Sequence, residues 1–575
     1  MKVIVSLLAA LLCLGLAQSE QTGTGGAAAT VDRFATEVAV GILRSGGNAV
    51  DAAVAAAAVL NVTNPFSVGI GGGGFMVVYL AEEDRVVTID AREMAPGAAT
   101  PDMFIDEATG EGVPFFPERI SSGLAVGIPG TLLGWEVALE KYGTLDLATV
   151  LGPATEIAEE GFPITQTFSD QVAANAERFA VFPATAELYF DNGEVPEAGS
   201  IHRNPDLAKT FRTIAEQGTA AFYAGAIGED LVATVQAPQT VDDPPFTVRG
   251  QEMTMADLDA YEVRIRRPTL SSYRGYDIYG MGPPSSGGLT VGLILNILDT
   301  FDLSAMSEEE ALHHMLEASR LAYADRGAYM ADSDFVNVPV EGLLSQDFAA
   351  TRAPLITGEA GADPEPGNPF EFQTDPSPPL LPTAMSPDTE GVSTTHLTTA
   401  DEDGNVVSFT TTIESTGGTG IVVPGRGFLL NNELTDFDSA PGGPNVVEPF
   451  KRPRSSMSPT IVMRDGEPVM ALGSPGGSTI ITTVTQIILN VTDFGMSLPD
   501  AINAPRLSQR NSSNTSVEAD VAQNLLDALA ERGHTFSDPN EIGAATGIFF
   551  EGDTVTAAAE AVRRSSGTAQ VVSPE

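Results

Sequence analysis

A proline-rich stretch past the middle of the chain most constrains how this sequence can fold. Nine prolines lie between Pro354 and Pro387, among small and acidic residues that show no sustained periodicity. Proline lacks a backbone N–H and fixes one dihedral angle, so neither a long helix nor a central strand can run through this stretch. We therefore predict a large portion over residues 20–393 that ends in a linker over residues 354–390, and a smaller portion over residues 394–575.

The large portion carries helical patterns near its start. Apolar residues recur at helical spacing from Val31 to Ile42, and the pattern stops at Gly46-Gly47. Asn48 can then cap a second, alanine-rich helix that runs toward Val62 and is apolar on most faces. We expect this second helix to be buried.

A glycine run, Gly69 and Gly71 to Gly74, leads into a strand-like segment that ends at Leu80. A dinucleotide-binding loop requires strand, glycines and helix in that order, and here the order is inverted. We interpret these glycines as positions where backbones approach closely between core layers.

A second helix signal lies farther along the large portion. Ser307 and Glu310 form a capping box that starts a helix carrying His313 and His314. Adjacent helix positions point about 100° apart, so these two histidines cannot share a metal ion as residues i and i+4 can. We interpret both as ordinary helix residues.

The portion after the proline-rich stretch is patterned as hairpins. Residues 394–399 and 406–413 are β-rich and are joined by Asp403-Gly404, while residues 459–463 and 469–472 are joined by Asp465-Gly466. A helical run over residues 480–491 follows. The sequence thus combines helices and antiparallel strands in one α/β (α+β) chain.

The N-terminus has the pattern of a secretory signal peptide. Lys2 precedes an apolar run that ends at Ala17, and Ala17 and Ser19 have the small-x-small spacing of a cleavage site. We predict a signal peptide over residues 1–19 and a periplasmic or extracellular location. Cys13, the single cysteine, lies inside this segment, so the mature chain would contain no disulfide or cysteine-bound metal.

The charge balance is strongly acidic. Asp and Glu number 77 against 29 Lys and Arg, which gives a formal net charge of -48. Such a chain is a poor partner for nucleic acid, whose phosphates it would repel. The acids are spread along the whole chain, which favours a solvated surface adapted to high salt over a local functional field.

Thr394 opens the β-rich portion. A threonine hydroxyl is a poor nucleophile unless a base lies beside it, but an N-terminal threonine carries its own base, the α-amine, whose usual pKa is about 8. This chemistry requires a cut between Ser393 and Thr394. By itself Thr394 is an ordinary strand threonine, and only its neighbouring motifs change that interpretation.

Gly476-Gly477, just before the predicted helix, can supply two backbone N–H groups at the positive end of a helix dipole. Such donors can stabilise an oxyanion, although a glycine turn into a helix is also common. No lysine follows a glycine in the manner of a phosphate-binding loop.

Four blocks of the small portion, in this order, resemble the gamma-glutamyltranspeptidase (glutathione hydrolase) family. They are residues 394–398 (TTHLT), 431–437 (NNELTDF), 452–460 (RPRSSMSPT) and 473–478 (GSPGGS). The resemblance extends to Tyr323-Ala324-Asp325-Arg326 and to residues 283–288 (PPSSGG). It implies a four-layer αββα sandwich of the N-terminal-nucleophile hydrolase type, one large domain formed by two subunits after the precursor cleaves itself before Thr394.

The resemblance also implies roles for particular residues. Thr394 would be the nucleophile, Thr412 would support its hydroxyl, and Gly476 and Gly477 would hold the oxyanion. A γ-glutamyl group carries an α-carboxylate and an α-ammonium, so it needs an arginine with hydroxyls at one end and acids at the other. Position by position, the carboxylate clamp would be Arg92, Ser455 and Ser456, and the ammonium partners would be Glu433, Asp436 and Glu414.

Two departures from the family pattern lead to further expectations. The connection from Pro444 to Lys451 is short where several relatives insert a lid, which indicates a lid-less bacterial subgroup with an open substrate cleft. Gly417 stands where relatives usually have an aromatic residue, so we expect looser packing behind the threonines.

The implied function is cleavage of the γ-glutamyl amide of glutathione and related compounds, with transfer of the acyl group to water, an amino acid or a dipeptide. No cofactor or metal is implied, and no membrane contact after signal removal. Three alternatives stay open. They are a glutaryl- or cephalosporin-type acylase, a γ-polyglutamate hydrolase, and a non-catalytic extracellular protein that binds γ-glutamyl peptides.

Overall fold

The computed structural model describes residues 19–106, 108–374, 393–439, 442–561, 563 and 567–572. The predicted signal peptide over residues 1–19 lies almost wholly outside these ranges, as does the second part of the predicted linker, residues 375–390. Within the described residues no helix is both long and apolar enough to cross a membrane.

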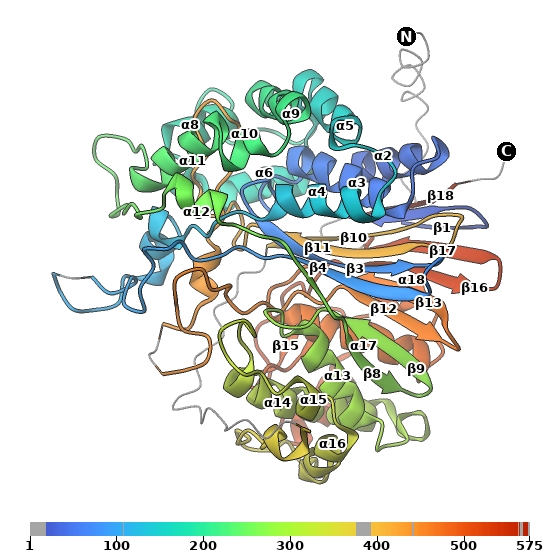
Figure 1. Cartoon of the computed structure of the whole chain (residues 1–575). Helices are drawn as coiled ribbons and strands as arrows, with labels where there is room; N and C mark the ends of the chain where they lie inside the picture. Colours follow the sequence, from blue (N-terminus) through green and yellow to red (C-terminus); the bar gives the residue numbers. More distant parts are fainter. Residues whose placement is uncertain are drawn as a thin grey trace.

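Two seven-stranded antiparallel sheets form the centre of the molecule (Figure 1). In spatial order, the first sheet consists of β18 (Thr568–Val571), β2 (Ala27–Thr30), β10 (Thr394–Ala400), β11 (Val406–Thr412), β3 (Gly73–Leu80), β4 (Arg85–Ala91) and β7 (Arg264–Arg266). The second consists of β1 (Glu20–Gly23), β17 (Thr554–Ala559), β16 (Thr546–Glu551), β13 (Glu467–Gly473), β12 (Thr460–Arg464), β9 (Tyr276–Gly280) and β8 (Thr269–Tyr273).

Helices cover the outer face of each sheet, so the molecule has four layers (Figure 1). Over the first sheet lie α2 (Arg33–Arg44), α3 (Ala49–Thr63), α4 (Thr131–Tyr142), α5 (Leu147–Glu160), α6 (Gln166–Ala174), α7 (Ala176–Phe179), α8 (Pro183–Tyr189), α9 (Pro205–Gln217), α10 (Ala220–Tyr223), α11 (Ala226–Gln236) and α12 (Met255–Asp259). The other helical layer contains α13 (Gly287–Leu298), α14 (Glu308–Tyr329), α15 (Val340–Leu343), α16 (Gln346–Arg352), α17 (Thr479–Thr492), α18 (Leu498–Asn503) and α19 (Gln523–Glu531).

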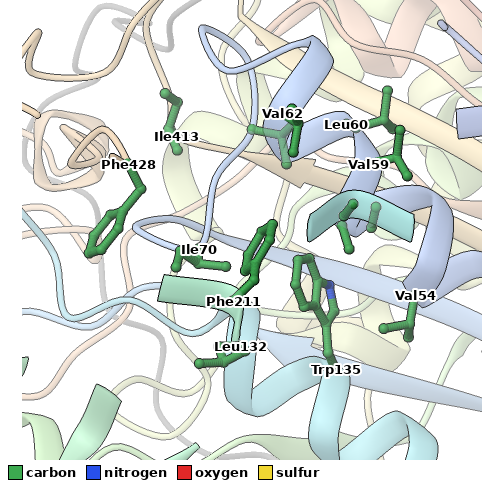
Figure 2. Packing of buried hydrophobic residues seen from close by; sticks show 14 of the residues in the cluster. Val54, Val59, Leu60, Val62, Ile70, Leu132, Trp135, Phe211, Ile413 and Phe428 are labelled. Carbon is green, nitrogen blue, oxygen red and sulfur yellow. The ribbon is translucent and has the colours of Figure 1, made fainter. Parts of the chain in front are cut away.

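The predicted elements near the N-terminus are confirmed. Asn48 caps α3 with a full capping box, and all residues of α3 are buried between α2, α5 and the first sheet. Its small alanines let neighbouring elements approach closely, while Trp135 of α4 and Phe211 of α9 fill the space nearby (Figure 2).

The alternation of side chains along β3 shows that the first sheet is buried on both faces. Met76 and Val78 face the core between the first sheet and its helices, whereas Phe75 and Val77 face the core between the two sheets. This period of two is what a strand with two buried faces requires. The two predicted hairpins are present as β10–β11 and β12–β13, and the predicted helix is α17.

The glycine run before β3 provides close backbone approach, as predicted. A Cβ atom on Gly72 would lie 2.1 Å from the carbonyl oxygen of Thr412, and one on Gly71 would lie 2.2 Å from that of Leu429. The predicted capping box at Ser307 starts α14. His313 and His314 point apart: His313 pairs with His534, with 2.8 Å between Nδ1 and Nε2, and His314 packs on Phe301.

The prediction of an unpacked linker from residue 354 onward is wrong for residues 354–374. Phe370 is buried, and the backbone at Gly367 is bound from both sides, because its N–H donates to Asp325 (2.6 Å) and its carbonyl accepts from the Tyr329 hydroxyl (2.5 Å). Side chains of α14 satisfy the backbone of this aperiodic segment, so it packs without forming a long helix or strand of its own.

Candidate active site

Thr394 is the first residue of β10, a central strand of the first sheet, and it is buried. It lies opposite Thr412, the last residue of β11, and the two hydroxyl oxygens are 3.2 Å apart. The Thr412 hydroxyl donates to the carbonyl oxygen of Ser393 at 2.9 Å and accepts from the backbone N–H of Glu414 at 2.9 Å. Thr412 therefore contacts both the threonine and the peptide bond that precedes it.

Ser393 is held from its other side. Its hydroxyl lies 2.9 Å from the carbonyl oxygen of Phe66, to which it donates, and 3.0 Å from the hydroxyl of Ser67. The Ser393–Thr394 peptide bond is thus fixed between the start of β10 and the segment that follows α3.

Gly476 and Gly477 form the turn between β13 and α17, with φ values of +136° and +57°. A Cβ atom on Gly476 would lie 2.5 Å from the Thr479 hydroxyl, so the turn requires glycine there. Among the described residues, neither backbone N–H donates a hydrogen bond. The two donors are available to an anion.

Arg92 follows β4 and is almost fully buried. Its guanidinium binds Glu433 through Nη1 and Asp436 through Nη2 at 2.6 Å, and it also donates to the carbonyl oxygens of Pro453 (3.2 Å) and Arg454 (2.9 Å). The sequence predicts Arg92 and these acids at opposite ends of a ligand, but here they contact each other. Buried opposite charges pair because an isolated buried charge is costly.

Glu93 is a fully buried neighbour of this cluster that the sequence analysis missed. Its carboxylate is 4.0 Å from the Arg92 guanidinium, and burial raises its pKa to about 7 against the opposing effect of Arg92. Burial likewise raises the pKa of Glu433, with a contribution from the nearby Glu93 carboxylate. Both carboxyl groups therefore hold a proton to higher pH than an exposed glutamate does. The signal was available, since Glu93 directly follows Arg92 in a conspicuous acidic-basic motif.

Glu414 has an unusual backbone for a residue other than glycine, with φ of +78°. Its carboxylate accepts from the Ser415 hydroxyl at 2.5 Å and from the side-chain amide of Asn432. Strained backbone of this kind persists only where surrounding contacts enforce it, and it concentrates at functional sites. Glu414 lines the same pocket as Glu433 and Asp436.

One small pocket brings the predicted residues together. Its lining consists of Arg92, Thr394, Thr412, Glu414, Glu433, Asp436, Ser455, Met457, Gly477 and Ile480. All the predicted site residues except Gly476 and Ser456 are in this set, and apolar Met457 and Ile480 were not predicted. Ser456 is buried, and its hydroxyl accepts from Arg326 at 2.7 Å.

The short connection packs against the site, because the Asn445 side chain donates to the Asp436 carbonyl oxygen (2.8 Å) and accepts from the Arg454 N–H (2.8 Å). One expectation about the surroundings is wrong. Packing behind the threonines is tight at Gly417, where a Cβ atom would lie 2.5 Å from the Phe179 ring. Phe179, distant in sequence, supplies the aromatic group that this position lacks.

A buried threonine at the start of a central strand, beside a second threonine and a glycine turn in a four-layer αββα sandwich, defines the class of N-terminal-nucleophile hydrolases. The family model for gamma-glutamyltranspeptidase matches residues 35–571. The chain belongs to the gamma-glutamyltranspeptidase family.

Individual relatives agree with this assignment. The glutathione hydrolase proenzyme of Bacillus subtilis (strain 168) is 43% identical over 538 residues, which cover 93% of this chain and 89% of that protein. The corresponding proenzyme of Escherichia coli (strain K12) is 38% identical, with 91% and 88% covered. Among solved structures, a cephalosporin acylase from Bacillus halodurans superposes with a TM-score of 0.85 at 26% identity and covers 98% of both chains.

Proposed function

We propose that this chain is an autoprocessed gamma-glutamyltransferase and glutathione hydrolase whose nucleophile is Thr394. The observation that carries the proposal is the contact of the Thr412 hydroxyl with both the Thr394 hydroxyl and the Ser393 carbonyl oxygen. This contact supports the proposal because Thr394 would act as nucleophile and Thr412 as polarising donor at the one peptide bond whose cleavage would free the amine of Thr394.

Maturation begins with attack of the Thr394 hydroxyl oxygen on the Ser393 carbonyl carbon. The C–N bond breaks, the hydroxyl proton passes to the departing nitrogen, and Ser393 is left as an ester on Thr394. Water then hydrolyses this ester. The products are a large subunit of residues 20–393, after removal of residues 1–19, and a small subunit of residues 394–575.

Turnover uses the freed α-amine as the base that accepts the Thr394 hydroxyl proton. The oxygen attacks the γ-amide carbonyl, and the N–H groups of Gly476 and Gly477 stabilise the resulting oxyanion. The amine of the substrate leaves with the proton that the α-amine accepted, and a γ-glutamyl ester remains on Thr394. Water, or the amine of an amino acid or dipeptide, then releases the acyl group.

Substrate recognition follows from the charges of the pocket. The α-carboxylate of a γ-glutamyl group takes the place of Glu433 and Asp436 on the guanidinium of Arg92, with Ser455 and Ser456 as hydroxyl donors. Its ammonium is then held by Glu433, Asp436 and Glu414. A bound zwitterion thus replaces internal ion pairs by equivalent external ones, which limits the desolvation cost of binding.

Two measurements on one preparation test this function. The protein is separated on a denaturing gel and the smaller chain is sequenced from its N-terminus, and turnover of a chromogenic γ-glutamyl anilide is followed with and without a dipeptide acceptor. We expect two chains, the smaller starting at Thr394, and anilide release that a dipeptide accelerates. A single uncleaved chain without turnover would instead indicate a γ-glutamyl peptide-binding protein.

We further propose export to the periplasm or the extracellular medium.

A second candidate, a glutaryl- or cephalosporin-type acylase, is favoured by the superposition on the Bacillus halodurans acylase structure. A glutaryl group carries the carboxylate but no ammonium, so it offers no cation to the three acids of the pocket. A glutaryl anilide offered beside the γ-glutamyl anilide distinguishes the two candidates. We expect a clear preference for the γ-glutamyl donor.

A further inference from the structure

Two residues of the large portion, Tyr323 and Arg326, contact segments that carry candidate site residues. They lie three positions apart on α14, in the helical layer next to the second sheet (Figure 1), and both are buried. Residues at this spacing share one face of a helix, and the Arg326 guanidinium carbon is 5.5 Å from the centre of the Tyr323 ring. Neither residue lines the pocket or has a role in the proposed chemistry.

Arg326 binds the segment that carries the two site serines. Its Nη2 donates to the Ser456 hydroxyl at 2.7 Å, and its Nε donates to the Ser286 hydroxyl at 2.8 Å. The Ser286 hydroxyl in turn donates to the carbonyl oxygen of Ser455 at 2.7 Å. One guanidinium therefore fixes the side chain of Ser456 directly and the backbone of Ser455 through Ser286.

The chemistry of arginine determines what this contact does to Ser456. A guanidinium only donates hydrogen bonds, so the Ser456 oxygen must accept and its own hydrogen must point elsewhere. Within the described part of the chain, no acceptor takes that hydrogen. Ser456 is thereby oriented as a donor, which is what recognition of a carboxylate requires.

Tyr323 binds the other side of the site. Its hydroxyl donates to the carbonyl oxygen of Ser478, the N-cap residue of α17. Ser478 directly follows Gly477, so this hydrogen bond holds the end of the glycine turn whose N–H groups are available to an oxyanion. A small displacement of such donors weakens their interaction with the transition state.

We infer that Tyr323 and Arg326 are positioning residues with separate tasks: Arg326 orients the Ser455–Ser456 segment toward the substrate carboxylate, and Tyr323 orients the Gly476–Gly477 turn toward the oxyanion. The inference deepens the proposed function and rests on it. It predicts that two substitutions on one helical turn have different kinetic signatures, since ground-state recognition affects KM and transition-state stabilisation affects kcat.

The test compares Arg326→Lys and Tyr323→Phe with matched controls from the same helix. Tyr329→Phe also removes a hydroxyl that binds a backbone carbonyl, and Arg320→Lys also replaces an arginine that binds a backbone carbonyl. Each variant is assayed with a γ-glutamyl anilide and with a 4-aminobutyryl anilide, which lacks only the α-carboxylate. Thermal melting of each variant reports general loss of structure.

For Arg326→Lys we expect KM for the γ-glutamyl donor to rise roughly ten-fold with kcat little changed, and the preference for this donor over the 4-aminobutyryl donor to fall by a similar factor. For Tyr323→Phe we expect kcat to fall roughly ten-fold on both donors with KM unchanged. The controls should match the wild-type protein.

Three outcomes would overturn the inference. Variants that behave like their controls, or an Arg326→Lys variant that loses activity equally on both donors, would contradict positioning while leaving the proposed function intact. A wild-type protein with no γ-glutamyl turnover would contradict the proposed function and, with it, the roles built on that function.

Discussion

At the scale of single residues, the candidate site is defined by what each polar group can donate or accept. Thr412 donates its hydrogen to Ser393, so it can only accept from Thr394. Arg92 has four polar partners within the protein. Contacts inside the protein therefore organise the site, and the loss of a single polar atom should change its activity.

The two roles proposed for Thr394 can be separated by substitution. Thr394→Ala removes the hydroxyl and should give an uncleaved, inactive precursor. Thr394→Ser keeps a hydroxyl and, after cleavage, an α-amine, so it should mature more slowly and retain reduced turnover. Gel analysis and the anilide assay measure both effects. If the alanine variant matures and turns over substrate like the wild type, Thr394 is only a strand residue.

Glu93 should make stability depend on pH in a predictable direction. Its pKa in the folded protein, about 7, is raised above the ordinary value of 4.5, so the folded state favours the protonated form. The stability contribution is complete below about pH 4.5 and is lost as pH rises through about 7. Glu93→Gln, which stays neutral, should remove this loss, up to about 3 kcal/mol.

Thermal melting between pH 4 and pH 8, without substrate, measures the effect. The control is Glu402→Gln, which changes an exposed acid in the turn between β10 and β11 and should leave the pH profile unchanged. If the melting temperatures of the wild type and of Glu93→Gln change with pH in the same way, the group that titrates in this cluster is not Glu93.

At the scale of elements, the two sheets contact each other through His396 of β10 and Gly473 of β13. The two ring nitrogens of His396 form hydrogen bonds with the hydroxyls of Thr410 and Thr398. Burial lowers the pKa of His396 to about 3. A Cβ atom on Gly473 would lie 2.3 to 2.7 Å from three atoms of this ring. Glycine is thus required at the end of β13 by a side chain from the opposite sheet.

Gly473→Ala should therefore destabilise the protein by about 1 to 3 kcal/mol through overpacking. Chemical denaturation measures the free energy of unfolding. Gly152→Ala is the matched control, because it places the same methyl group on α5, where no atom beyond the chain neighbours and the backbone of the same helix lies within 4 Å. This variant should be neutral or stabilising. If the two variants have the same free energy of unfolding, the two sheets can accommodate an extra methyl group at Gly473, and the overpacking argument is wrong.

At the scale of the whole molecule, the net charge of -48 is the dominant property. Like charges spread over a surface destabilise the compact state, and dissolved salt screens them. The melting temperature should therefore rise when NaCl increases from about 10 mM to about 150 mM, a range over which the Debye length falls from about 30 Å to about 8 Å. A melting temperature independent of salt in this range would show that local ion pairs already compensate the excess charge.

Local chemistry is what the sequence by itself determined. Asn48 and Ser307 cap their helices, and Asp403-Gly404 turns the hairpin that places Thr394 opposite Thr412, because caps and tight turns involve residues close together in the chain. The resemblance of short motifs to a family then identified residues of which all but Gly476 and Ser456 line one pocket.

Only the tertiary structure decided contacts between distant segments. The pairing of Arg92 with Glu433, the ring of Phe179 against Gly417, the packing of residues 354–374 on α14, and the support of the site by Tyr323 and Arg326 join parts of the chain that no local pattern relates. The physical reason is that burial and charge pairing act between neighbours in space. Their strength depends on which side chains share a buried environment, and that environment exists only once the layers have packed.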